Sequence, residues 1–202
     1  MLSDVIRANV APYLKEQGFV KKGTVWNRTN GEVVNVLDVQ KGSPRRDGRI
    51  DFTLNVGIWM HEVWTICWAR PTPDFIRETD CFPRFRIGLL LEDFNPKFRD
   101  KWWSLDSQQS VSAVGEELRG ILKGACFPLF GRLARVGDVL SFVETSIPIR
   151  FPLERLYLGI LRHVNGYKDQ AEMEISELLT DSHWSKRAQG VLVRLRERDG
   201  VR

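Results

Sequence analysis

Apolar residues in the first 17 positions are spaced as on one face of a helix. They follow the i, i+4, i+8 spacing of an amphipathic helix. Proline has no backbone N–H and its ring clashes with the preceding turn, so Pro12 predicts either a kink or a second helical piece that begins there. Gly18 is expected to cap the C-terminal end. The stripe consists of Val5, Ile6, Val10, Tyr13 and Leu14.

Four later segments have the alternating or continuous apolar pattern of β-strands, at about residues 24–28, 32–40, 50–59 and 85–91. Asn30-Gly31 separates the first two and is typical of a two-residue hairpin turn, in which both residues need positive φ. We therefore expect an antiparallel sheet of about four strands. The third strand has one apolar face and one small or polar face: Phe52, Leu54, Val56 and Ile58 against Thr53, Asn55 and Gly57.

The spacing of apolar residues becomes helical in the second half of the chain. Strands followed by helices indicate an α+β fold, packed by the N-terminal helix and followed by a mostly helical C-terminal half. Pro148 and Pro152 mark a linker and suggest an α+β domain over 1–147 with a helical extension over 148–202. Pro128 is expected to break the first long helix. The expected helices cover 111–122, 129–143 in one or two pieces, 153–165, 168–179 and 184–198.

Polar residues on the predicted strands form one candidate site. A polar side chain that faces a protein core is costly unless it is hydrogen-bonded. Such residues could line a shallow pocket on one sheet face, although a solvent-facing side of an antiparallel sheet is the commoner explanation. The set is Asn35, Thr53, Asn55 and Arg86.

Aromatic residues form a second candidate site, because the chain has seven tryptophans. Tryptophan and arginine are enriched where proteins meet proteins, and an exposed patch of them would bind a partner. Burial in the core is the competing explanation and accounts for most tryptophans in most proteins. The residues predicted to bind a partner are Trp59, Trp64, Trp68, Trp102, Trp103, Arg84 and Arg86.

The net charge of +4 is confined to the C-terminus. From Lys186 onward there are six basic and two acidic residues, whereas the first 185 residues hold 24 of each sign. A basic last helix could bind nucleic acid. Stabilisation of the negative end of a helix dipole is the simpler explanation, and a neutral body disfavours nucleic acid as a partner. The residues of the nucleic-acid alternative are Lys186, Arg187, Arg194, Arg196 and Arg198.

The sequence contains none of the phosphate-binding or nucleophile-elbow motifs that have a clear mechanism. His61-Glu62 begins like a metalloprotease helix, but Thr65 stands where the second histidine belongs, so we predict neither a metal nor another cofactor. Cys81 lies close to Arg84, which could lower its pKa and make it a nucleophile. A small buried thiol is the commoner role. No catalytic residue is predicted.

Several short segments resemble a known family. The stretch Leu14-Lys15-Glu16-Gln17-Gly18-Phe19-Val20-Lys21-Lys22-Gly23 is similar to the LK-x-x-GF-x-KKG opening of the bacterial domain of unknown function 4304. Later strand signatures follow in the same order, over residues 34–41, 52–58, 81–86 and 102–103. Phe82 departs from the histidine that often follows the central cysteine. The resemblance covers about residues 1–135 and implies an α+β fold and a bacterial source, but no activity.

These observations lead to a first hypothesis of a non-enzymatic protein-binding domain, such as an immunity or accessory protein that blocks a toxin or effector. The alternatives are a nucleic-acid-associated protein that uses the basic C-terminal helix, and an enzyme centred on Cys81. No apolar run approaches the roughly 20 residues of a membrane helix, and Met1-Leu2-Ser3-Asp4 does not begin a secretory signal. We therefore expect a cytoplasmic protein without membrane partners.

Overall fold

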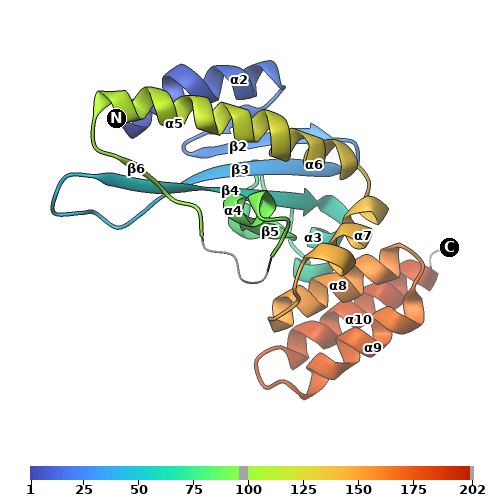
Figure 1. The fold of residues 1–202 in the computed structure, drawn as a ribbon. Helices are drawn as coiled ribbons and strands as arrows, with labels where there is room; N and C mark the ends of the chain where they lie inside the picture. Colours follow the sequence, from blue (N-terminus) through green and yellow to red (C-terminus); the bar gives the residue numbers. More distant parts are fainter. Residues whose placement is uncertain (96–99, 201–202) are drawn as a thin grey trace.

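Six strands form one antiparallel sheet in the computed structural model, which describes residues 1–95 and 100–200. The strands are β1 Val20–Lys22, β2 Val25–Asn30, β3 Val33–Lys41, β4 Ile50–Met60, β5 Arg84–Arg86 and β6 Trp103–Leu105. Their order is β1-β2-β3-β4-β5, and β6 pairs with the start of β4, along the edge that β5 also uses (Figure 1). With helices before and after it, this sheet confirms the predicted α+β class.

The first three predicted strands correspond to β2, β3 and β4, but the fourth prediction is mostly wrong. Only Arg84–Arg86 is a strand, and the apolar run after it forms the short helix α4, Ile87–Leu91. β5 pairs with Asn55–Gly57 and β6 with Ile50–Phe52, so a long fifth strand would occupy the edge where β6 lies.

The hairpin between β2 and β3 differs from the prediction by one residue. Asn30 pairs with Val33, so the turn residues are Gly31 and Glu32. Gly31 has a φ of +61°, and a Cβ there would lie 2.5 Å from the carbonyl oxygen of Ala134. Glycine is therefore required both by the turn and by the close approach of a distant segment.

Two prolines in helical segments each follow a π-helical turn. Pro12 lies in α2, Ala11–Glu16, which continues from α1, Leu2–Val5, through the π-helix η1, Ile6–Val10. Pro128 lies in α6, Phe127–Arg132, which continues from α5, Gln108–Ile121, through the π-helix η3, Leu122–Cys126. Because a widened turn avoids the clash of the proline ring, the helical path persists, and the expected break at Pro128 is wrong.

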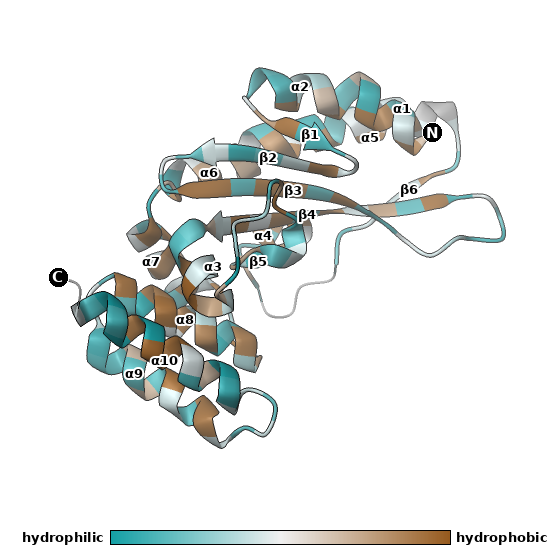
Figure 2. Cartoon of the chain, turned by 180° about the vertical axis from the view of Figure 1, so that it is seen from behind, coloured by the Kyte–Doolittle hydropathy of each residue, from teal (hydrophilic) through white to brown (hydrophobic). Residues whose placement is uncertain are grey.

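The N-terminal helices and the α5–α6 segment cover one face of the sheet (Figure 1). Apolar side chains of β3 and β4 meet them there, and Figure 2 shows β3 as mostly hydrophobic with short hydrophilic interruptions. The other face is covered in part by α3, His61–Trp68, and by the chain that follows it. Its buried residues form a smaller cluster: Val36, Trp59, Trp64, Ile76 and Cys81.

The C-terminal helices pack as a bundle beside the end of the sheet (Figure 1). They are α7 Val136–Ser146, α8 Pro152–Val164, α9 Lys168–Ser176 with the 3₁₀ turn η4 Glu177–Thr180, and α10 Ser185–Gly200. Helix α3 contacts both α8 and α10, and one hydrophobic core includes residues from the sheet and the bundle. The boundary between 147 and 148 stays a prediction. Within 1–95 and 100–200, no helix is long and apolar enough to cross a membrane.

Candidate binding sites

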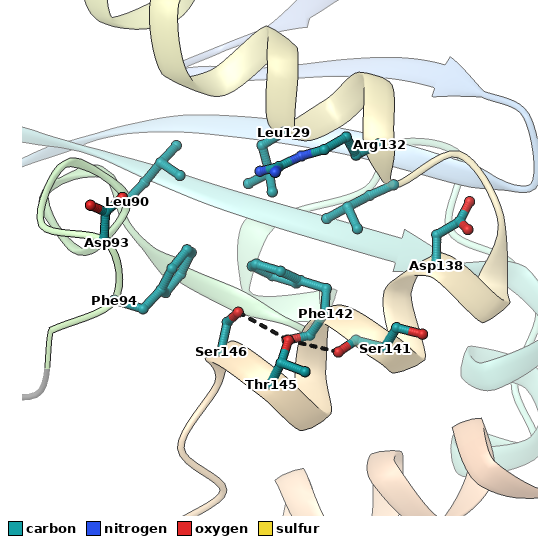
Figure 3. Close-up of a pocket in the computed structure, with 11 residues that line it drawn as sticks. Leu90, Asp93, Phe94, Leu129, Arg132, Asp138, Ser141, Phe142, Thr145 and Ser146 are labelled. Atoms are coloured by element: carbon teal, nitrogen blue, oxygen red, sulfur yellow. Dashed lines mark hydrogen bonds between the residues drawn. The ribbon is translucent and has the colours of Figure 1, made fainter.

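A groove of about 560 Å³ lies between α4, α6 and α7 (Figure 3). The turn after α4 supplies Phe94, α6 supplies Arg132, and α7 supplies Phe142. No sequence pattern linked these segments, because each contributes residues that look ordinary within its own helix. The lining residues are Leu90, Asp93, Phe94, Leu129, Arg132, Leu133, Asp138, Ser141, Phe142, Thr145 and Ser146.

Two aromatic rings form the apolar floor of this groove. The rings of Phe94 and Phe142 meet edge to face, with centroids 5.1 Å apart and an interplanar angle of 76° (Figure 3). Asp93 and Phe94 both have positive φ, 48° and 58°, which is uncommon for residues with side chains. This strained turn directs Phe94 toward Phe142, and both rings stay partly exposed. Such strain is known to gather at functional sites.

The rim of the groove carries the exposed cation Arg132. Its side chain has no hydrogen bond or ion pair among the residues that the structure describes. The nearby carboxylate of Asp138 is engaged by Arg135, at 3.5 Å. The groove therefore combines an apolar floor with a guanidinium that is free to bind an acceptor.

Three of the predicted tryptophans form a row that runs from the sheet to the bundle. The ring centroids of Trp59 and Trp64 are 6.5 Å apart, and those of Trp64 and Trp68 are 5.6 Å apart. Trp59 and Trp64 are buried, and Trp68 donates a 2.7 Å hydrogen bond to the hydroxyl of Tyr157. The row thus connects the sheet to α8.

The other two predicted tryptophans lie at the opposite end of β4, so the five do not form one exposed patch. Trp103 is buried and stacks on Phe52 at 5.5 Å. Trp102 is partly buried beside Arg86, whose guanidinium lies 5.3 Å from its ring. Arg86 also pairs with Asp100. The partner-binding role of these residues stays a prediction, but Trp59, Trp64 and Trp103 would have to be uncovered to fill it.

The predicted polar set is divided between the two faces of the sheet. Thr53, Asn55 and Arg86 lie on the face that α3 partly covers, where Thr53 donates to the carbonyl of Lys101 at 2.8 Å. Asn35 is the exception, because its register places it on the opposite face, fully buried. The expectation of one pocket lined by all four residues is therefore wrong.

Asn35 has a specific partner in the main core. Its side-chain oxygen accepts a 3.1 Å hydrogen bond from the guanidinium of Arg28, which pairs with it across β2 and β3. Arg28 in turn lies over the rings of Phe19, Phe127 and Phe130, at 4.9–5.7 Å. The pair is a polar contact enclosed by aromatic residues, and burial lowers the pKa of Arg28.

Arg84 and the partly buried carboxylate of Glu78 form a second polar contact on the partly covered face. The two groups are 3.3 Å apart, and Arg84 is half exposed. Burial raises the pKa of Glu78, and the nearby carboxylate of Asp38 adds to this, while Arg84 opposes it. Burial thus makes the ionised form of the Glu78 carboxylate less favourable than it would be in water.

The basic residues of α10 mostly contact the protein itself. Arg187 and Arg194 donate hydrogen bonds to backbone carbonyls at the end of α3. Arg196 pairs with Glu172, and Arg198 pairs with Glu62. Lys186 is the only one of the five predicted nucleic-acid residues without such a contact in the described part of the chain. Arg202 lies outside the described residues.

The thiols do not have the environment of nucleophiles. Cys81 is buried, and burial together with Glu78 and Asp80 raises its pKa well above the ordinary value. Burial also raises the pKa of Cys67 and Cys126 to about 12. Since the thiolate is the reactive form, these residues are protonated and shielded at neutral pH. Among the described residues, no group of three histidine, cysteine or carboxylate side chains could hold a metal ion.

Comparison with known proteins gives one match. The family described as "Domain of unknown function (DUF4304)" matches residues 10–132, from the N-terminal helix to the end of α6. No curated protein and no solved structure matches the chain.

Proposed function

Since this chain belongs to the family described as a domain of unknown function (DUF4304), we propose from its geometry that it is a non-enzymatic protein-binding domain. The observation that carries the proposal is the groove between α4, α6 and α7, with Phe94 and Phe142 on its floor and Arg132 on its rim. Aromatic and arginine side chains are the residue types that most often dominate binding energy at protein interfaces.

The groove favours a partner segment that presents an apolar side chain next to a carboxylate. The apolar side chain would cover the edge-to-face rings of Phe94 and Phe142, which stay partly exposed in the free protein. The carboxylate would pair with Arg132, whose planar guanidinium suits bidentate binding. A volume of about 560 Å³ accommodates a few side chains of such a segment.

The partner class that we propose is a toxin or effector, which this domain would bind and hold inactive. Blocking requires only a stable complex that covers the partner's working surface, so it needs no reactive group on this chain. The raised pKa of Cys81 is consistent with such a role and disfavours the alternative of a Cys81-centred enzyme.

Copurification with a matched pair of variants tests the proposal. Ser141→Arg places a long side chain in the groove, at an exposed position of α7 whose hydroxyl bonds only within its own helix. Ser112→Arg makes the same change at an exposed position of α5 that does not line the groove. We expect tagged wild-type protein and Ser112→Arg to retain one stoichiometric protein from native cells, and Ser141→Arg to lose it.

Two results would overturn the proposal. One is that no stoichiometric protein is retained by the wild type. The other is that Ser141→Arg and Ser112→Arg retain the same protein equally, because the groove would then not be the contact surface. Thermal unfolding of both variants accompanies the experiment, so that loss of binding is not confused with loss of folding.

A further inference from the structure

A second pocket, of about 350 Å³, lies where the end of α3 meets α10. It is smaller than the α4–α6–α7 groove and shares no residue with it. Three of its lining residues are lysine or arginine, a fourth is a histidine, and none carries a carboxylate. The lining consists of Cys67, Trp68, His183, Lys186, Arg187, Gly190 and Arg194.

The two arginines in this pocket are held by backbone carbonyls instead of carboxylates. Arg194 donates to the carbonyl of Ile66 at 2.6 Å and to that of Cys67 at 3.4 Å, and Arg187 donates to the same Cys67 carbonyl at 3.4 Å. Carbonyls at a helix C-terminus carry only partial negative charge. Among the described residues, neither guanidinium forms an ion pair with a carboxylate, although Glu197 is close enough to influence Arg194.

Both arginines also retain unused donors. A guanidinium has five N–H groups, and these contacts occupy one on Arg187 and two on Arg194. Burial lowers the pKa of Arg194. The neighbouring charge of Arg187 also lowers this pKa, whereas Cys67 and the carboxylate of Glu197 oppose the shift. An anion placed between the two arginines would accept hydrogen bonds from their unused N–H groups and reduce the repulsion between their positive charges.

Neighbouring residues hold the two arginine side chains of the pocket in place. The guanidinium of Arg187 lies 4.0 Å from the centre of the Trp68 ring, which restricts its movement. Gly190 leaves room for Arg194 to fold back along α10, since a Cβ at Gly190 would lie 3.2 Å from its Nη1. Arginines already ordered in the free protein lose less conformational entropy when a ligand binds.

We propose that this pocket binds the phosphate groups of a small phosphorylated molecule. Phosphate oxygens match the fork of arginine donors, and Lys186, which also lines the pocket, would add a third charge. A nucleic-acid strand fits less well, because Arg196 and Arg198 farther along α10 are paired with Glu172 and Glu62. The available cations therefore form one cluster and not a stripe along a backbone.

Calorimetric titration with pyrophosphate and with ADP, in a phosphate-free buffer, tests the proposal. Lys186→Glu changes a side chain that has no hydrogen bond or ion pair in the described structure, in the first turn of α10, where an acidic residue suits the helix dipole. Lys123→Glu is the matched control, because it is exposed, lies in η3 and lowers the net charge equally. We expect Lys186→Glu to weaken binding about tenfold or more, and Lys123→Glu to change it less than about twofold.

Binding of neither probe at millimolar concentration overturns the proposal, and so does an equal loss in both lysine variants, which would indicate net charge alone. A single-stranded oligonucleotide forms the third arm. If it binds more tightly than ADP, with a steep dependence on salt, the ligand is nucleic acid and the small-molecule proposal is wrong. None of these results depends on the groove that Ser141→Arg tests, so the two proposals can fail separately.

Discussion

The two faces of the sheet have the same strands but different covers. On one face, Phe52, Leu54, Val56 and Ile58 lie under helices that come from both before and after the sheet in sequence. On the other, α3 and the chain after it cover the region around Gly57, while Thr53 and Asn55 hydrogen-bond to neighbouring polar groups. Because the first face belongs to the larger buried cluster, we expect it to contribute more to stability than the second, whose cover is one irregular segment.

The largest expected effect is on the helix-covered face. Phe52 is fully buried and stacks on Trp103, so Phe52→Ala removes a ring from a closed core and leaves a cavity. We expect a loss of about 3–5 kcal/mol in the free energy of unfolding, measured by urea denaturation. Phe151→Ala is the matched control, because that ring is 63% exposed, and it should change stability by less than about 0.5 kcal/mol. Similar losses in the two variants would contradict this view of the core.

The next effect concerns the partly covered face. A Cβ at Gly57 would lie 2.7 Å from both Cβ and Sγ of Cys81, so Gly57→Ala must push away the segment that covers the sheet. We expect a loss of about 1–3 kcal/mol. Gly120→Ala, where a Cβ meets nothing within 4 Å, should instead stabilise its helix slightly. If Gly57→Ala unfolds no more easily than the wild type, the segment over this face moves without cost.

The sequence predicts a strand well where apolar and polar residues alternate along it. It predicts a strand less well where two segments compete to pair with the same sheet edge. Phe52 to Ile58 shows the period of two, and β4 forms as expected. After Arg86 the apolar residues fit a strand equally well, but part of the β4 edge belongs to β6, which lies later in the chain. The local pattern of apolar residues after Arg86 gives no information about this competition with β6.

The candidate sites were predictable in residue type but not in arrangement. The sequence predicted one partner-binding set of five tryptophans, of which only Trp59, Trp64 and Trp68 form a row. Their burial depends on α8 and on the chain after α3, which no local pattern reveals. The groove was missed for the same reason, since Phe94 and Phe142 meet only in three dimensions.

Asn35 and Asn55 lie on opposite faces of the sheet, so the same substitution at both positions compares the two faces. Asn35 accepts from Arg28 among aromatic rings, whereas Asn55 donates to Gln40 at 3.0 Å, and Gln40 is only partly buried. Asn35→Ala removes an acceptor from the charged, partly buried guanidinium of Arg28, which then keeps, among the described residues, only its 3.4 Å hydrogen bond to the carbonyl of Gln17. The neutral amide of Gln40 can instead turn to water. We expect Asn35→Ala to cost about 1 kcal/mol more than Asn55→Ala in urea denaturation. Equal losses in the free energy of unfolding would contradict this difference between the two faces.

The smallest effect follows from Glu78, the half-enclosed carboxylate on the partly covered face. Because its pKa is raised by burial above the ordinary 4.5, the folded state favours the protonated form. Protonated Glu78 therefore contributes its full share to the free energy of unfolding below pH 4.5. This share is lost as the pH rises through the pKa of Glu78 in the folded state. We expect Glu78→Gln to be more stable than the wild type near pH 7, by less than about 1 kcal/mol because the pair with Arg84 is half exposed and screened. The difference should vanish near pH 3.5, measured by urea denaturation at both pH values. A variant that is less stable than the wild type only at pH 7 would show that attraction to Arg84 outweighs the cost of burying the charge.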